Sequence, residues 1–351
     1  MPRTTNGYHR ITASAVAALA LGLAACTDSP SNPVSPQQMA APDVASLSSS
    51  DNDAVHGHVM LVKGATQLEA YKNANKRPGG GTGISYHGGP VLVSGTNVAA
   101  VYWSSTPIFN GGPAVGTAGS GASDGSLVGT FLRGLGGSPY FNINTTYTNG
   151  SGTHIANSVS YTQYWANGTN APSGTTSISD AQMVAMLQSG FNSGALTYDA
   201  STVYAIFTSG KVNLGGGFGT QYCAYHTHGT VTVNGVSKTV LYAAMPYNYA
   251  YPSACTSGYA PANGSADPGA DYEVNTLAHE IEETTTDMMG TAWFDNRGYE
   301  NADKCAWTWG TTQTAANGAA YNLTLTENGV SKHFLVQRNW IAPNGGCAMS
   351  Y

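Results

Sequence analysis

This sequence has few charged side chains. Only 9% of its 351 residues are Asp, Glu, Lys or Arg, against about a quarter in an average soluble protein. The 13 basic residues form no run or patch and the net charge at pH 7 is −6. A nucleic-acid partner is therefore not expected, because such binding depends on clustered Lys and Arg. Glycine and neutral polar residues take the place of charge, as is common in secreted proteins.

Several catalytic and binding motifs are also missing. The sequence contains no Gly-x-Ser-x-Gly elbow, so it gives no support to Ser-His-Asp catalysis. The glycine runs at 79–81 and 215–217 are not followed by Lys-Ser or Lys-Thr, which excludes a phosphate-binding P-loop. No Cys-x-x-Cys pair is present, and a four-cysteine zinc site is disfavoured for that reason.

The N-terminal residues predict export. Arg3 and Arg10 precede an apolar stretch, residues 11–23, that is short for a membrane span. Leu23-Ala24-Ala25-Cys26 then matches the bacterial lipoprotein signal, although an ordinary signal peptide with a chance cysteine is the alternative. We predict a signal peptide over 1–25, a lipidated Cys26 and an envelope or cell-surface protein that touches the membrane through its lipid anchor alone.

The rest of the chain divides into a linker and one domain. Residues 26–54 are rich in Ser, Pro, Ala and Asp and lack apolar periodicity, which predicts a disordered stalk. Residues 55–351 show no clear second boundary. Four cysteines remain there, and in an exported chain they suggest two disulfides with three possible pairings. Loop lengths favour Cys223–Cys255 and Cys305–Cys347.

Periodicity within the domain predicts an α+β fold. Strands are expected at 97–103 and 203–207, and a hairpin turns at Asn234-Gly235. Helices are expected at 127–135, at 180–191 after the N-cap Ser179, and at 271–289 before Gly290. A last hairpin turns at Glu327-Asn328-Gly329. These elements predict one mixed sheet with helices packed on it.

The helix at 271–289 carries the most informative pattern. His279 and Glu283 are four residues apart and therefore share one helix face, with Glu280 beside them. The same spacing in the His-Glu-x-x-His signature of metalloproteases lets two histidines bind zinc while the glutamate acts as a general base. Here Glu283 replaces the second histidine, so the motif is His-Glu-x-x-Glu on a zincin-like fold.

Charge around this motif points to a cation. Seven acidic residues and no Lys or Arg lie between Asp271 and Asn296. Within each of the pairs Glu280–Glu283 and Glu283–Asp287, two like charges repel each other on one helix face. These residues also lie toward the C-terminal end of the helix, where the helix dipole disfavours negative charge. A bound metal ion would remove this repulsion. The alternative is an acidic helix face that is solvated or purely structural.

Residues downstream complete the predicted site. We expect His279, Glu283 and Glu300 as metal ligands, Glu280 as the general base and Asp303 as a residue that supports a ligand histidine. Asp287 is an additional supporting residue or an alternative ligand, and helix capping or pairing with Lys304 or Arg297 is the alternative for Glu300 and Asp303. Zn²⁺ is the expected ion, and the oxygen-rich ligand set also suits Mn²⁺ or Ca²⁺.

Across the domain the sequence resembles the exordium, or phosphate-induced protein, family of secreted plant wall proteins and their bacterial relatives. The resemblance spans residues 86–347 and implies an extracellular protein linked to the cell wall, without an established reaction. It rests on these stretches: Tyr86-His87-Gly88-Gly89-Pro90-Val91, Val101-Tyr102-Trp103, Cys223-Ala224-Tyr225-His226, His279-Glu280-Ile281-Glu282-Glu283, Thr286-Asp287, Trp293-Phe294-Asp295, Glu300-Asn301-Ala302-Asp303-Lys304-Cys305 and Gln337-Arg338-Asn339-Trp340.

Two functions follow from these patterns. The first is a metal-dependent hydrolase, peptidase-like, that acts on a peptide or cell-wall polymer, with His226 as a further catalytic candidate that stabilises an oxyanion. The second is a non-catalytic protein that binds the cell wall or a carbohydrate on a degenerate zincin-like fold. The aromatic clusters at 247–251 and 307–309 motivate the second function, because such rings stack on sugars.

Overall fold

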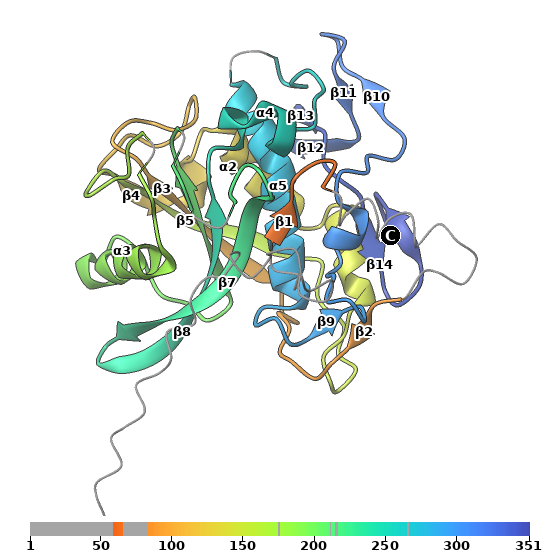
Figure 1. The fold of residues 1–351 in the computed structure, drawn as a ribbon, viewed down its shortest axis with the longest axis horizontal. Helices are drawn as coiled ribbons and strands as arrows, with labels where there is room; N and C mark the ends of the chain where they lie inside the picture. The colour runs from red at the N-terminus through yellow and green to blue at the C-terminus, as the bar shows by residue number, and fades with distance from the viewer. Residues whose placement is uncertain (1–58, 66–82, 175, 211, 215–216, 265–266) are drawn as a thin grey trace, which may run out of the picture. The chain divides into compact units, whose positions relative to one another are not determined.

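Buried strands flanked by amphipathic helices build a mixed α+β fold around one large sheet (Figure 1). The computed structural model describes residues 59–65, 83–174, 176–210, 212–214, 217–264 and 267–351. All of them belong to one compact unit. The predicted signal peptide, the lipidated Cys26 and the stalk lie outside the described residues.

The large sheet combines a parallel centre with antiparallel edges. Within the described residues its strand order is β1-β7-β8-β6-β3-β5-β4, and the strands from β8 to β5 run parallel. Strands β1, β7 and β4 pair antiparallel to their neighbours. The bounds are β1 Val59–Leu61, β3 Thr96–Trp103, β4 Ala118–Ser120, β5 Val159–Asn167, β6 Thr202–Thr208, β7 Tyr222–Val233 and β8 Val236–Met245.

Helices cover both faces of this sheet. Alternate residues of the central strands point to opposite sides, so Val98 packs with α2 and α5 while Ala99 packs with α3. Central parallel strands need such cover on both faces. The helices are α2 Leu127–Leu135, α3 Asp180–Ser193, the short α4 Pro252–Cys255, and α5 Pro268–Thr286.

Short elements make up much of the rest of the described chain. Two-stranded ladders form between β2 Ser85–Tyr86 and β9 Trp293–Phe294, β10 Gln313–Thr314 and β11 Ala320–Tyr321, β12 Leu323–Glu327 and β13 Val330–Phe334, and β14 Asn339–Ile341 and β15 Gly346–Ala348. Single 3₁₀ turns are η2 Gly121–Ser123, η3 Phe141–Thr146, η4 Asn248–Ala250 and η5 Asp303–Cys305. No helix in the described part of the chain is both long and apolar enough to cross a membrane.

The two favoured cysteine pairings are confirmed. Cys223 and Cys255 lie at disulfide distance with Cα atoms 5.4 Å apart, and Cys305 and Cys347 do so with Cα atoms 5.6 Å apart. The first bond ties β7 to α4, and the second ties η5 to β15. Both disulfides therefore brace segments that surround the C-terminal half of α5.

The predicted helix at 271–289 is displaced toward the N-terminus. Helix α5 begins at Pro268, because Asp267 caps it by accepting the Ala270 N–H at 3.0 Å. It ends at Thr286, because Asp287 leaves the helical conformation with φ −149° and ψ 60°. The Asp287 carboxylate then accepts backbone N–H groups of Thr291 and Ala292 at 2.6 and 2.7 Å. A side chain that binds the turn ends this helix before Gly290.

Candidate metal centre

The acidic face of α5 is buried. His279, Glu280, Glu282 and Glu283 are all 0% exposed, so the alternative of a solvated acidic face is wrong. The apolar side of α5 packs on the sheet, as expected for a helix on a mixed sheet. Residue spacing could not show that β7, η5 and the segment after β13 cover the opposite side.

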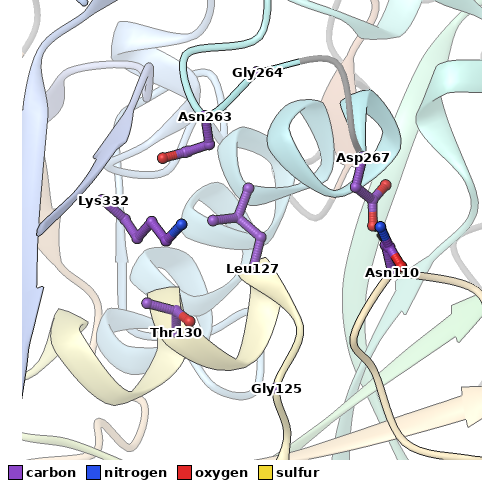
Figure 2. Close-up of a pocket in the computed structure, with 8 residues that line it drawn as sticks. All are labelled: Asn110, Gly125, Leu127, Thr130, Asn263, Gly264, Asp267 and Lys332. Carbon is purple, nitrogen blue, oxygen red and sulfur yellow. Dashed lines mark hydrogen bonds between the residues drawn. The ribbon is translucent and has the colours of Figure 1, made fainter. Parts of the chain in front are cut away.

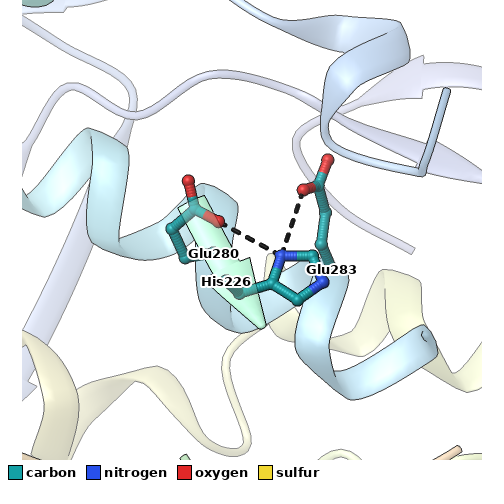
Figure 3. Close-up of side chains that lie close together, drawn as sticks. All are labelled: His226, Glu280 and Glu283. Atoms are coloured by element: carbon teal, nitrogen blue, oxygen red, sulfur yellow. Dashed lines mark hydrogen bonds and ion pairs between the residues drawn. The ribbon is translucent and has the colours of Figure 1, made fainter. Parts of the chain in front are cut away.

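Strand β7 delivers His226 to this face. Residues alternate along the strand, so Ala224 and His226 point toward α5 while Tyr225 packs with α3. His226 Nδ1 lies 3.2 Å from Glu280 Oε2 and 3.6 Å from Glu283 Oε2 (Figure 3). His226 therefore contacts the carboxylate that the sequence predicts as the general base.

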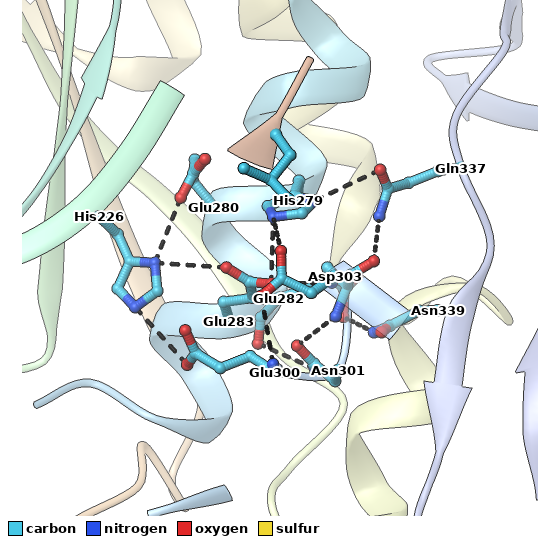
Figure 4. Close-up of polar contacts among 12 residues, drawn as sticks. His226, His279, Glu280, Glu282, Glu283, Glu300, Asn301, Asp303, Gln337 and Asn339 are labelled. Atoms are coloured by element: carbon cyan, nitrogen blue, oxygen red, sulfur yellow. Dashed lines mark hydrogen bonds and ion pairs between the residues drawn. The ribbon is translucent and has the colours of Figure 1, made fainter. Parts of the chain in front are cut away.

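His279 has a different partner on each ring nitrogen (Figure 4). Its Nδ1 lies 3.3 Å from Gln337 Oε1, and the Gln337 amide is oriented by donating to the Ala302 carbonyl at 2.7 Å. Its Nε2 lies 3.1 Å from Glu283 Oε1 and 3.5 Å from Asp303 Oδ1. Because Nδ1 donates to Gln337, Nε2 of a neutral ring presents a lone pair to two carboxylate oxygens.

That arrangement needs a positive charge at Nε2. A lone pair facing two carboxylates is repulsive, and either a proton or a metal ion between them makes the contacts attractive. Burial lowers the pKa of His279, but Glu283, Asp303 and Glu280 outweigh it and raise the pKa well above its ordinary value. Without a metal ion these carboxylates favour the protonated ring, and with one the ring is a ligand.

Asp303 takes the position that the sequence assigns to Glu300. The ligand atoms of His279, Glu283 and Asp303 lie within 4.8 Å of one another. Asp303 contacts the inner nitrogen of His279, whereas Gln337 holds the outer one. Glu300 instead lies beside the other histidine, with its Oε1 3.8 Å from His226 Nε2. The sequence showed the acidic pair of Glu300 and Asp303, but not which of them would turn toward His279.

Asp287 and Glu282 have structural partners. Asp287 binds the turn after α5 through Thr291 and Ala292. Glu282 lies on another side of α5 and accepts hydrogen bonds from the side-chain amides of Asn144 and Asn339, the latter at 2.7 Å. Glu282, Asn144 and Asn339 thus hold α5 against η3 and β14. Sequence reasoning assigned no role to Gln337 or Asn339, although both lie in the Gln337–Trp340 stretch of the family resemblance.

The centre carries more negative charge than the described part of the chain balances. Burial raises the pKa of Glu280 and of Glu300 well above the ordinary range, and raises that of Glu283 to about 8. Four carboxylates, those of Glu280, Glu283, Glu300 and Asp303, face two imidazoles. The ammonium group of the neighbouring Lys304 lies 3.1 Å from Asp295 Oδ2 and above the ring of Trp340. Protons or cations must supply the missing positive charge.

Glu280 and Glu283 each have one buried carboxylate oxygen that lacks a hydrogen-bond donor. In the portion of the chain that the structure describes, Glu280 Oε1 and Glu283 Oε2 accept no hydrogen bond. Buried carboxylate oxygens are rarely left in this state, because the loss of water costs several kcal/mol per ion. Such oxygens, next to imidazole nitrogens, are ligands that Zn²⁺ and Mn²⁺ accept. The residues present therefore fit a divalent cation.

A separate cavity of about 170 Å³ lies at the N-terminal ends of α2 and α5 (Figure 2). Two of its polar side chains form hydrogen bonds within the protein. Asn263 contacts Asp271 and the His333 carbonyl, and the Asp267 carboxylate accepts N–H groups of Asn110 and Ala270. Asp267 lies twelve residues before His279, or about 18 Å along the helix. This cavity is thus a feature of helix packing, distinct from the centre.

Neither protein-family models, nor curated protein sequences, nor solved structures provide a match to this chain. Its function is therefore interpreted from the geometry of the centre.

Proposed function

We propose that this chain is a metal-dependent hydrolase, peptidase-like, with a zincin-like arrangement of its site helix. The observation that carries the proposal is His279 Nε2, which faces Glu283 Oε1 and Asp303 Oδ1 while Nδ1 is held by Gln337. An oriented imidazole with two converging carboxylates supplies three protein ligands, the number common in catalytic zinc sites, in a set richer in oxygen than most of them. Zn²⁺ is the first candidate, with Mn²⁺ or Ca²⁺ as alternatives.

The residues around this set have distinct roles. His279, Glu283 and Asp303 would hold the ion, which would polarise a carbonyl group and favour deprotonation of a water molecule. Glu280 would accept that proton at Oε1, because Oε2 faces His226 while Oε1 accepts no hydrogen bond within the described residues. His226 is then a positioning residue for Glu280, a different role from the predicted oxyanion contact.

The proposed setting is the cell envelope. The predicted lipoprotein signal with Cys26 and the resemblance to the exordium family support an exported, lipid-anchored protein that meets cell-wall polymers or peptides. The two disulfides are consistent with an oxidising compartment.

Metal content is the direct test. The full-length protein, purified without a nickel column, should contain zinc or manganese by elemental analysis. Glu283→Ala and Asp303→Ala should lose the ion, whereas Glu327→Ala, which removes a carboxylate of β12 outside the centre, should retain it. A metal-free parent protein that is folded by circular dichroism would refute the proposal.

Glu280→Gln separates catalysis from binding. This variant should keep the ion held by His279, Glu283 and Asp303 and lose about 10²- to 10⁴-fold in the rate of any hydrolysis found on a panel of peptides and peptidoglycan fragments. Unchanged turnover by a metal-loaded Glu280→Gln protein would remove Glu280 from the mechanism.

Exposed aromatic rings favour a second candidate function, binding of a cell-wall glycan. Tyr249 and Tyr259 are 40% and 46% exposed, and Tyr249 stacks on Tyr272 with ring centroids 5.3 Å apart. Aromatic faces of this kind can stack on sugars. Peptidoglycan should then retain the protein in EDTA, and retention should fall in a Tyr249→Ala/Tyr259→Ala variant. Tyr351→Ala, at another exposed tyrosine, is the control, and equal retention of all three proteins would exclude this surface.

A further inference from the structure

We infer that the centre holds two divalent cations, at adjacent positions bridged by Glu283. The inference rests on the proposed function and deepens it, since the second position is formed by His226, Glu280 and Glu283. The ligand atoms of this second group also lie within 4.8 Å of one another.

Glu283 has the geometry of a bridging carboxylate. Its Oε1 faces His279 Nε2 at 3.1 Å, and its Oε2 faces His226 Nδ1 at 3.6 Å. Each oxygen is thus directed to a different imidazole from a different element, His279 on α5 and His226 on β7. Each oxygen also meets a second carboxylate nearby, that of Asp303 on the first side and that of Glu280 on the other. Two metal ions in hydrolytic enzymes commonly lie about 3.5–4 Å apart and share such a ligand.

His279 has the orientation of a metal ligand, because Gln337 Oε1 accepts a hydrogen bond from its outer nitrogen. In metal sites such an acceptor fixes the ring tautomer and directs the inner lone pair to the ion. Glu300 Oε1 lies 3.8 Å from the outer nitrogen of His226, a distance for charge attraction and too long for a hydrogen bond. Glu300, predicted as a ligand, thus becomes the outer partner of His226, while the inner Nδ1 faces Glu280 and Glu283.

Charge favours an ion at the second position as well. With neutral imidazoles, the ionised carboxylates of Glu280, Glu283 and Asp303 carry three negative charges. One divalent ion would balance two of them, and because these side chains are at most 2% exposed, a second ion would remove the remaining electrostatic cost. Glu283 Oε2, which accepts no hydrogen bond among the described residues, faces His226 Nδ1 at the second position. Glu280 would bind through Oε2 and keep Oε1 for proton transfer.

Manganese titration tests this inference without a substrate. Mn²⁺ added to the chelator-treated full-length protein should bind at two ions per chain, counted by equilibrium dialysis and elemental analysis. Two Mn²⁺ ions that share a carboxylate are exchange-coupled, so the electron paramagnetic resonance spectrum at full loading should differ from that of isolated Mn²⁺. This spectrum is measured on the parent protein and does not depend on whether a variant folds.

Variants then assign the positions. His226→Ala and His279→Ala should each bind one uncoupled ion per chain, and His228→Ala, two residues along the same strand, should still bind two. One ion in the parent protein that persists in His226→Ala and is lost in His279→Ala would overturn the second position and leave the proposed function standing. Two uncoupled ions in the parent would overturn the bridge, and no bound ion would overturn both proposals.

Discussion

Glu273 is a buried carboxyl group one and a half turns before His279 on α5. It is 0% exposed, and its Oε2 accepts the backbone N–H of Asn248 at 3.1 Å. Burial raises its pKa to about 8, and the hydrogen bond from Asn248 only partly offsets this. The folded protein therefore keeps a proton on Glu273 at pH values where the unfolded chain has released it.

This difference predicts that stability falls as pH rises from about 4.5 to about 8, because the folded state binds more protons across that window. Glu273→Gln should remove this part of the pH dependence. Within the window the free energy of unfolding of the variant should therefore rise relative to that of the parent by about 1.4 kcal/mol for each pH unit. Urea unfolding at pH 5 and pH 8.5 measures the gain.

Glu327→Gln is a control of opposite sign. The hydrogen bond with Arg133 lowers the pKa of Glu327, so the stability that Glu327 contributes is present at neutral pH and is lost as pH falls through its folded pKa. Glu327→Gln should therefore lower the free energy of unfolding at neutral pH and leave it unchanged in acid. If the Glu273→Gln and parent curves ran parallel, the buried-acid explanation would fail.

At the scale of residues, the sequence predicted the close approach of His279 and Glu283. The four-residue spacing of His279 and Glu283 was sufficient, because both lie on one helix and local geometry fixes their approach. The places of Asp303, His226 and Gln337 depend on how η5, β7 and the segment after β13 pack on α5. Those contacts join residues far apart in the chain, and spacing alone could not choose Asp303 over Glu300.

At the scale of elements, the start of α5 is held by one side chain. Asp267 accepts the Ala270 N–H at 3.0 Å through Oδ1 and the Asn110 N–H at 2.5 Å through Oδ2 (Figure 2). It therefore caps the helix that carries the centre and also joins it to the loop after β3.

Asp267→Ala should lower the free energy of unfolding by about 1–2 kcal/mol, in the range for loss of an N-cap. Ser179→Ala removes the capping box of α3 on the opposite face of the sheet and should cost about 1 kcal/mol. Chemical denaturation measures both. Neither variant should lose bound metal, because each side chain lies outside the centre. Loss of metal from Asp267→Ala alone would show that the cap also sets the geometry of His279 and Glu283.

Elements with strong local signals were predicted and edge strands were not. The Asn234-Gly235 turn, with φ 52° and 75°, gives the β7–β8 hairpin, and Ser179 forms the predicted cap of α3. Strand β1 is three residues long and pairs with β7 far along the chain. No local pattern in Val59–Leu61 specifies that partner, because the pairing is decided by which edge of the sheet remains open.

For the whole molecule, the centre joins segments that are distant in sequence. Its residues come from β7, α5, the turn before η5 and η5 itself, and the disulfides Cys223–Cys255 and Cys305–Cys347 brace β7 and η5. Strand, helix and turn therefore meet at charges that repel one another unless protons or a cation are bound. Bound metal should accordingly stabilise the folded chain as well as supply chemistry.

Metal removal should destabilise the whole domain. An ion that binds only the folded state adds about 2.7 kcal/mol when its free concentration is 100 times Kd. For a domain of 150–250 residues each kcal/mol corresponds to about 2–4 °C in Tm, so EDTA should lower Tm by several degrees and added Zn²⁺ or Mn²⁺ should restore it. Thermal unfolding followed by circular dichroism measures this shift.

In Glu283→Gln, which removes a charge at the point shared by both histidines, Tm should not respond to EDTA. An equal response to EDTA in parent and variant would place the stabilising ion elsewhere, because only an ion held by Glu283 couples β7 to η5 through α5.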